Sequence, residues 1–263
     1  MAVYSPISSK NNEKIKTVRK LFDKKYRLQF GLFVLEGHKL VYDYIRSGSN
    51  PVQIFVTEEA LEKYGYIVDS AGCHEVYVLS RELYLHISSE SAPQGILAVC
   101  RIPEKNGDFC SGKAVILESV RDAGNLGTVI RTAVAFGIDN IVLSSDCADI
   151  YNPKTLRAAM GGVFFGNVLV VDDLCAFVED IRKKGRRVFA AMPAGDAVDV
   201  RDVDIRSDDC MVIGNEGNGI SASLAALCTC NVTIPMRGDT ESLNASAAAS
   251  ILMWELVRGG NGQ

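Results

Sequence analysis

Two polar side chains, Asn125 and Arg131, stand six positions apart beside an apolar run in the middle of the chain. Asn125 ends a loop that also carries Asp122 and Gly124, and apolar residues recur at helical spacing over residues 126–136. Asparagine before such a segment is a typical N-cap, so we expect Asn125 to accept a backbone N–H of the first turn. A guanidinium on an otherwise apolar helix either extends to solvent or faces an anion such as a phosphate. This stretch alone is explained by a capped helix with a surface arginine.

Two later loops add further polar groups after predicted strands. Residues 214–219 follow an apolar run and contain three glycines and one carboxylate, Glu216. Residues 235–244 follow another predicted strand and end in Ser242 and Asn244, directly before a helical segment rich in alanine and serine. Glycine lets a ligand approach the backbone closely, while carboxylate, hydroxyl and amide groups can orient a substrate. Ser242 or Asn244 can equally cap the helix that follows.

Together these stretches resemble the signature motifs of the SpoU (TrmH) family of RNA 2′-O-ribose methyltransferases, in the SPOUT superfamily. The resemblance is carried by residues 117–133, 211–221 and 234–246, which occur in the family's order. It implies an enzyme that uses S-adenosylmethionine (SAM) to methylate a ribose 2′-hydroxyl of RNA. It also implies a homodimer formed through the C-terminal domain, and a deep trefoil knot in that domain, although knots are nearly absent from other folds.

The family's catalytic arginine falls on Arg131. Because a guanidinium keeps its proton in proteins, we expect Arg131 to grip a phosphate and orient the ribose rather than act as a general base. By the same resemblance, the other catalytic positions are Asn125, Glu216, Ser242 and Asn244, with Glu216 either pairing with Arg131 or contacting the nucleoside. The cofactor-binding positions that the resemblance implies are Gly214, Ile234 and Leu243, with Met192, Gly217 and Met236 beside them. For Ile234 and Leu243, ordinary packing in the core is the alternative to cofactor binding.

Strands and helices alternate along the whole chain, which indicates an α/β fold class. In the first half, residues 33–37 and 91–98 resemble the L30e-like substrate-binding domain found in many members of the family. We therefore expect a small L30e-like α/β domain for RNA substrate binding over residues 1–101 and a polar linker over 102–113. The SPOUT methyltransferase domain, with a mostly parallel sheet, is expected over 114–263. Such an appended domain favours rRNA over tRNA as the substrate.

The charge of the chain is unevenly distributed. The formal net charge is −4 at pH 7, which by itself does not favour a nucleic-acid partner. Basic residues nevertheless concentrate over residues 8–28, where the apolar spacing predicts one amphipathic helix. The basic run is either a solvated helix face or a patch that contacts phosphates. The candidate RNA contacts are Lys10, Arg27 and Lys39.

Several other classes of protein are disfavoured by the sequence. No apolar run approaches the roughly 20 residues that a membrane span needs, and the start of the chain lacks the pattern of a secretory signal. The eight cysteines and three histidines show no metal-ligand spacing, so we expect no metal, reduced cysteines and a cytoplasmic location. The glycines at 214, 217 and 219 do not have the spacing of a dinucleotide-binding or P-loop motif.

Two other functions fit the same fold. One is an RNA-binding or ribosome-assembly factor that has lost catalysis, and the presence of all five catalytic positions together argues against it. The other is methyl transfer to a base nitrogen. The spacing of Asn125, Gly127 and Arg131 and the run 242–244 favour ribose instead, because both match the ribose-methylating family.

Overall fold

The computed structural model describes residues 3–104, 109, 111–138, 140–193, 195–236 and 243–259. Backbone contacts divide the chain into two units. The first comprises Met1–Glu104 with Tyr151–Phe164, and the second comprises Lys105–Ile150 with Phe165–Gln263. The sequence analysis placed Tyr151–Phe164 in the domain over 114–263, but the side chains of this segment pack into the core of the first unit. An amphipathic helix shows which of its faces is buried and not which core it joins, so the sequence alone does not show that this segment packs on the first unit.

The first unit is built on a five-stranded sheet in the order β1-β4-β3-β5-β2. The strands are β1 (Val3–Ile7), β2 (Leu32–Glu36), β3 (Gln53–Thr57), β4 (Glu75–Leu79) and β5 (Ile96–Arg101). β1, β4 and β3 run parallel, whereas β5 is antiparallel to both of its neighbours, β3 and β2. The helices are α1 (Glu13–Lys20), α2 (Lys24–Phe30), α3 (His38–Arg46), α4 (Glu58–Ser70), α5 (Arg81–Ile87) and α7 (Pro153–Ala159).

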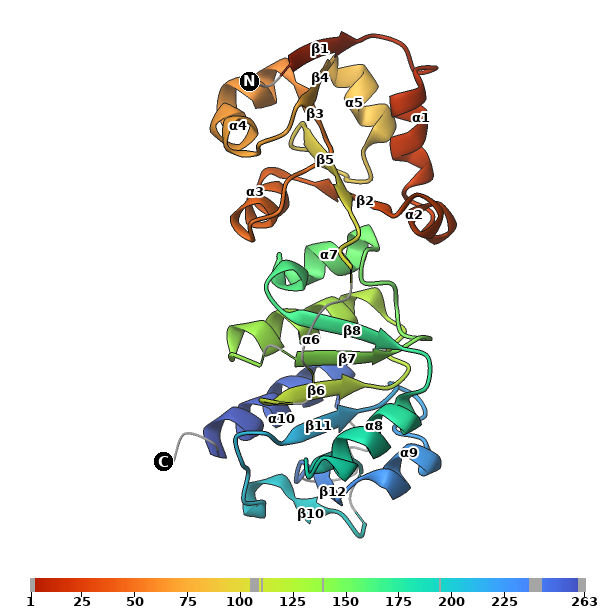
Figure 1. Cartoon of the computed structure of the whole chain (residues 1–263), viewed down its shortest axis with the longest axis vertical. Helices are drawn as coiled ribbons and strands as arrows, with labels where there is room; N and C mark the ends of the chain where they lie inside the picture. The colour runs from red at the N-terminus through yellow and green to blue at the C-terminus, as the bar shows by residue number, and fades with distance from the viewer. Residues whose placement is uncertain are drawn as a thin grey trace. The chain divides into compact units, whose positions relative to one another are not determined.

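Helices cover both faces of this sheet because its central strands are apolar on both sides. Along β2, Phe33 and Leu35 point into one core and Val34 into the other, as the alternation of a strand requires. The first core is closed by α3, α4 and α7, and the second by α1 and α5. Figure 1 shows α3 and α4 on one side of the sheet and α1 and α5 on the other.

The start of the chain differs from the expectation in two ways. The single helix predicted over residues 8–28 is two helices, α1 and α2, because Asp23 interrupts it and caps α2 by accepting the backbone N–H of Lys25 at 2.9 Å. The strand β1 was not predicted, since it is short, carries Pro6 and lies at the edge of the sheet.

The second unit contains a seven-stranded, all-parallel sheet in the order β10-β12-β9-β11-β6-β7-β8. Its strands are β6 (Ala114–Leu117), β7 (Asn140–Ser144), β8 (Asn167–Val171), β9 (Val188–Ala191), β10 (Val198–Asp199), β11 (Cys210–Ile213) and β12 (Cys230–Thr233). Its α-helices are α6 (Ala123–Ala135), α8 (Leu174–Lys183), α9 (Ala222–Leu227) and α10 (Ala245–Gly259). The mostly parallel α/β architecture expected from the sequence is confirmed.

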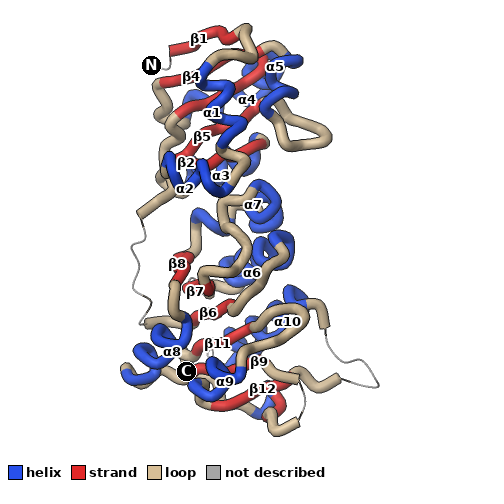
Figure 2. The backbone as a smooth tube through the Cα atoms, turned by 90° about the vertical axis from the view of Figure 1, so that its right-hand side faces the viewer, coloured by secondary structure: helices blue, strands red, loops and turns tan. Residues whose placement is uncertain are grey.

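This sheet is also covered on both faces. α8 and α9 pack on one face through Leu174, Val178 and Leu224, and α10 packs with α6 on the other (Figures 1 and 2). Because β12, β9, β11 and β6 are neighbours and parallel, the loops that leave their carboxyl ends meet at one edge of the sheet. These loops contain the segments that the sequence analysis singled out.

No helix in the described ranges is both long and apolar enough to cross a membrane.

Candidate functional site

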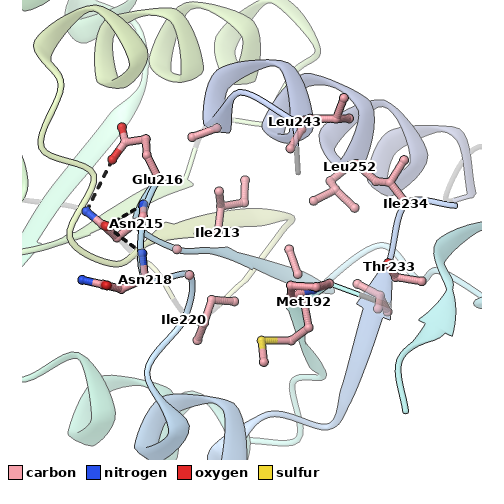
Figure 3. Close-up of a pocket in the computed structure, with 18 of the residues that line it drawn as sticks. Met192, Ile213, Asn215, Glu216, Asn218, Ile220, Thr233, Ile234, Leu243 and Leu252 are labelled. Carbon is pink, nitrogen blue, oxygen red and sulfur yellow. Dashed lines mark hydrogen bonds between the residues drawn. The ribbon is translucent and has the colours of Figure 1, made fainter. Parts of the chain in front are cut away.

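A pocket of about 570 Å³ opens at this edge of the second sheet. Four segments line it: the ends of β9 and β12 with the loops that follow them, the loop after β11, and the first turns of α10. Figure 3 shows Met192, Ile234, Leu243 and Leu252 around an apolar interior, while Asn215 and Glu216 stand along one rim. All six cofactor-binding positions inferred from the sequence line this one pocket: Gly214, Ile234, Leu243, Met192, Gly217 and Met236.

The glycine-containing rim folds back on itself. Asn215 and Gly219 exchange two backbone hydrogen bonds of 2.9 Å, and the Asn215 side chain accepts the backbone N–H of Gly217 at 2.9 Å and of Asn218 at 3.1 Å (Figure 3). A Cβ atom at Gly214 would overlap the backbone of Gly219, so only glycine fits there. The loop therefore offers a fixed row of backbone N–H and C=O groups beside the apolar interior.

The loop after β6 is tied to the same rim. The Asn215 side-chain amide donates to the Ser119 carbonyl at 2.8 Å, and the Glu118 carboxylate accepts the backbone N–H and the hydroxyl of Ser221 at 2.7 and 2.6 Å. Ser119 itself has a positive φ of 55°, which costs energy for a residue with a Cβ. Its hydroxyl donates to Asp146 at 2.6 Å, which helps to hold this conformation.

Three polar side chains from three segments distant in sequence meet beside this rim: the first turn of α6, the loop after β11 and the residue before α10. The Asn125 amide donates to Glu216 at 3.0 Å, and the Asn244 amide donates to the Asn125 side-chain oxygen at 3.3 Å. Asn244 is also the cap of α10, since its side-chain oxygen accepts the backbone N–H of Ser246 at 2.9 Å. The structure thus brings together Asn125, Glu216 and Asn244, whereas Ser242 lies outside the described residues.

The capping role expected for Asn125 is wrong. Asp122 caps α6 instead, because its carboxylate accepts the backbone N–H of Asn125 at 2.9 Å and the helix begins at Ala123. Asn125 therefore lies in the first turn, with its side chain free of the capping role and able to bond Glu216. Both residue types are good caps, so spacing alone did not decide between them.

Arg131 lies further along α6 and is exposed to solvent. In the described part of the chain it forms no ion pair with Glu216, which accepts hydrogen bonds from Asn125 and Asn215 instead. The alternative in which Glu216 fixes Arg131 is therefore not what the structure shows. The guanidinium remains available for an external anion, as the phosphate-binding role requires.

The three candidate RNA contacts of the first unit have different surroundings. The Lys10 ammonium lies 2.8 Å from the Glu82 carboxylate, and the Lys39 ammonium lies 4.0 Å from Asp43 with its side chain 58% exposed. Arg27 is only 2% exposed, and its guanidinium donates to a backbone carbonyl in the turn between α1 and α2. Its burial argues against an RNA contact, and we assign Arg27 a structural role instead.

Some residues that build the pocket were not identified from the sequence. Asn215 and Glu118 orient the rim through side-chain hydrogen bonds. These contacts join residues about 100 positions apart, and local spacing in the sequence does not predict them. Ala245, Ala248 and Leu252 line the pocket from α10, and their spacing of three and four residues could have identified this helix face. Among the described residues, no group of three or more His, Cys, Asp or Glu side chains is placed to hold a metal ion.

The chemistry of the pocket follows from this arrangement. A mostly apolar cavity with one rim of backbone donors and acceptors suits a flat heteroaromatic ligand with polar edges. The neighbouring carboxylate and amides can bind hydroxyl groups, and the exposed guanidinium can bind a phosphate. The site therefore fits two ligands of different character, one within the pocket and one beside its rim.

Two family models match the chain. The SpoU rRNA Methylase family matches residues 112–254, and the MRM3-like substrate binding domain matches residues 12–98. The first match contains the whole pocket rim and the three polar side chains beside it. The second covers most of the first unit, which supports the substrate-binding assignment made from the sequence.

Individual relatives match this chain over nearly the full length of both sequences. The 23S rRNA (guanosine(2553)-2′-O)-methyltransferase RlmP of Bacillus subtilis is 34% identical over 250 residues, which cover 95% of this chain and 98% of the relative. The SpoU methyltransferase AviRb from Streptomyces viridochromogenes, solved in complex with AdoMet, has a TM-score of 0.85 at 26% identity, covering 94% of this chain and 98% of that chain. An AdoMet-bound rRNA methyltransferase from Sinorhizobium meliloti has a TM-score of 0.84 at 27% identity, covering 97% and 98%. The chain therefore belongs to the SpoU rRNA methylase family.

Proposed function

We propose that this methyltransferase transfers the methyl group of SAM to a ribose 2′-hydroxyl of 23S rRNA. The observation that carries the proposal is the meeting of Asn125, Glu216 and Asn244 beside the pocket, since they come from three segments that are distant in sequence. The relatives named for 23S rRNA 2′-O-methylation, and the neighbours solved with AdoMet, support the substrate and the cofactor.

The pocket fits SAM. Its volume of about 570 Å³ falls in the range of small-molecule sites, and its apolar interior suits the adenine ring. Met192, Ile234 and Leu243 would hold that ring, and backbone groups at Gly214 and Gly217 would bind the polar edges. Bound there, SAM supplies an electrophilic methyl group on a positively charged sulfur.

The side chains beside the rim bind and align the RNA substrate. Arg131 binds the phosphate next to the target nucleotide and so aligns the ribose, since alignment of the two reactants contributes much of the rate. Asn125 and Asn244 position the hydroxyl, and Glu216 fixes the Asn125 amide. The hydroxyl proton leaves to the adjacent phosphate or to water, because Arg131 keeps its own proton.

We also propose a homodimer through the second unit. Two apolar side chains on α10 that do not line the pocket remain well exposed: Ile251 at 40% and Trp254 at 52%. The Trp254 ring packs against the ring of Phe136, the residue that follows α6, with centroids 5.6 Å apart. A second copy covering this face would remove it from water, as the family resemblance implies. The same resemblance supports the trefoil knot, and an rRNA substrate supports a cytoplasmic location.

The test is methyl transfer from labelled SAM to 23S rRNA purified from cells that lack the gene, followed by mapping of ribose methylation. We expect a single 2′-O-methylated nucleotide that the Arg131→Ala variant does not produce, while Lys183→Ala behaves like the parent protein. A methyl group on a base would refute the ribose assignment. RNA binding without SAM binding or methyl transfer would establish the alternative, a non-catalytic RNA-binding or assembly factor.

A further inference from the structure

A second cavity, of about 320 Å³, lies within the first unit and far in sequence from the residues of the SAM pocket. It is formed by the start of α4, the start of α5 and the loop before β5. The polar and aromatic residues that matter for its chemistry are Thr57, Lys63, Tyr64, Arg81 and Gln94. None of them takes part in the site described above.

Tyr64 is held in an unusual position on the wall of this cavity. It has non-helical backbone angles, φ −120° and ψ 16°, in the middle of α4, and the helix is kinked there. Its ring stacks on the His38 ring with centroids 4.6 Å apart and planes within 3° of parallel. The kink lies beside Gly65, a residue type that commonly interrupts helices, and the stack on His38 holds the Tyr64 ring at the cavity wall.

Gln94 holds His38, the residue stacked on Tyr64, through its side-chain oxygen, and its amino group remains able to donate. Its side-chain oxygen accepts the backbone N–H of His38 at 3.0 Å, which settles the orientation of the amide because a backbone N–H can only donate. The same oxygen lies 2.7 Å from the His38 Nδ1, which therefore carries the proton. Within the described part of the chain, the Gln94 amino group has no partner, although Gln94 lines the cavity.

Two cations stand at the cavity. The Lys63 ammonium lies 5.3 Å from the centroid of the Tyr64 ring. The Arg81 guanidinium lies 3.6 Å from Glu59, with both side chains at least 80% exposed. A surface ion pair of this kind contributes little stability, so Arg81 can exchange it for a phosphate at small cost.

The backbone also keeps the cavity open. Gly95 has a φ of +78°, and a Cβ atom there would lie 2.5 Å from the Thr57 hydroxyl and 2.9 Å from the Ala60 methyl. A larger residue at this position would push into the residues that form the cavity wall. The loop can therefore run close to α4 only because residue 95 is a glycine.

We propose that this cavity binds one unpaired nucleotide of the RNA substrate. The base lies against Tyr64, the Gln94 amino group donates to an acceptor on the base edge, and Lys63 and Arg81 bind the flanking phosphates. Only an unpaired nucleotide fits, because bases inside an RNA duplex are stacked and do not reach such a cavity. The proposal rests on the proposed function, since it names the form of RNA that the first unit selects.

The test compares binding of the full chain to a single-stranded oligoribonucleotide pool and to a duplex RNA, by filter binding. Tyr64→Ala and Gln94→Ala are the test variants. Tyr66→Ala is the matched control, because Tyr66 lies on the same helix, is 59% exposed and does not line the cavity. We expect Tyr64→Ala to weaken single-strand binding by about 5- to 150-fold, the range for losing one base–aromatic stack. Duplex binding and SAM binding should not change.

Equal single-strand affinities for Tyr64→Ala and Tyr66→Ala would overturn the proposal. If Tyr64→Ala fails to fold, Lys63→Glu replaces it, since Lys63 is exposed; unchanged affinity in that variant would overturn the proposal too. Methyl transfer is measured with the same proteins. Tyr64-dependent binding by a protein that methylates no RNA supports the cavity and refutes the proposed function. Methylation of rRNA with unaltered binding by Tyr64→Ala supports the function and refutes the cavity.

Discussion

The side-chain amide of Asn125 donates a hydrogen bond to the Glu216 carboxylate across 3.0 Å, although the two residues lie 91 positions apart in the sequence. The bond joins the first turn of α6 to the rim of the pocket at the edge of the second sheet. Asn244 extends it to the start of α10 through its own bond of 3.3 Å to Asn125. Asn125 is therefore the centre of the polar group, since it alone contacts both of the others.

Replacing Asn125 by alanine tests this central role. The Asn125→Ala variant loses the donor to Glu216 and the acceptor for Asn244, so we expect kcat for methyl transfer to fall about 100-fold. The affinity for SAM, measured by calorimetry, should stay close to that of the parent protein because Asn125 does not line the pocket. Thr128→Ala, on the same helix, should leave both quantities unchanged. A loss of SAM affinity as large as the loss of kcat would show that Asn125 supports the pocket instead.

The rim glycine provides a second prediction. In Gly214→Ala, the added Cβ atom overlaps the backbone of Gly219, and the pair of hydrogen bonds between Asn215 and Gly219 must open. We expect SAM binding to weaken at least about tenfold and unfolding to become easier by about 1–3 kcal/mol, as for other cases of overpacking.

Gly217→Ala is the matched comparison for stability. It lies in the same rim, and a Cβ atom there meets only the Asn215 side-chain oxygen at 3.5 Å, an ordinary contact. Its free energy of unfolding, from urea titration, should lie within about 0.5 kcal/mol of the parent protein. Equal stability of the two alanine variants would contradict the proposed closure of the rim.

Much of this site was predictable because its parts are local. Each motif follows an apolar strand and leads toward a helical run, so the three segments could be recognised locally, and the family resemblance that they carry implied all six pocket positions. The partners within the site were not predictable. Asp122 and Asn125 are both good caps three residues apart, so residue type and spacing did not decide which of them caps α6. Whether Glu216 bonds Asn125 or Arg131 depends on a contact between segments distant in sequence.

In the first unit, too, the sequence did not show which partner a charged side chain contacts. Arg27 looks like one more cation of a basic run, yet its guanidinium is buried and bonds the Leu21 carbonyl at 2.7 Å. The helix over Pro153–Ala159 begins with local signals, a cap at Asn152 and a proline in the first turn, but its assignment to the first core depends on Leu156 packing there. Residue type and spacing identify an element, while the choice of its partner is set by the tertiary fold.

A buried ion pair at the opposite end of the sheet supports a prediction about stability. The Asp209 carboxylate is fully buried and accepts two hydrogen bonds from Arg187, at 2.9 and 2.6 Å, and one from the backbone N–H of Arg206 at 2.6 Å. The Arg187→Met variant leaves this carboxylate buried without its cation. We expect the free energy of unfolding to fall by about 3–5 kcal/mol.

Arg201→Met is the control for the loss of an arginine from an ion pair. Arg201 pairs with Asp199 at 2.5 Å, but its side chain is 63% exposed. Loss of such an exposed pair should cost less than about 1 kcal/mol. Chemical denaturation of both variants at neutral pH makes the comparison, and similar losses in the two would show that burial of Asp209 does not set the cost.

The loop that carries Ser119 leads to a prediction about pH. Hydrogen bonds from the Ser119 and Ser144 hydroxyls, at 2.6 Å each, lower the pKa of Asp146 from 3.8 to about 2, with a smaller effect of Arg121. Because the folded-state pKa is the lower one, the ionised carboxylate stabilises the fold above about pH 4. That contribution disappears as the pH falls toward 2. The side chain is 45% exposed, so solvent screening limits the effect to about 1 kcal/mol or less.

The Asp146→Asn variant isolates this contribution. We expect it to be less stable than the parent protein by a constant amount from pH 5 to pH 7, and the difference to shrink as the pH falls from about 4 to about 2. Asp172→Asn, which removes an exposed carboxylate elsewhere in the unit, should show no such dependence. Denaturant titrations across this pH range give the difference directly. A difference that stays constant down to pH 2 would mean that the Asp146 charge does not hold the Ser119 loop, and that its hydrogen bonds act equally well when the carboxyl is protonated.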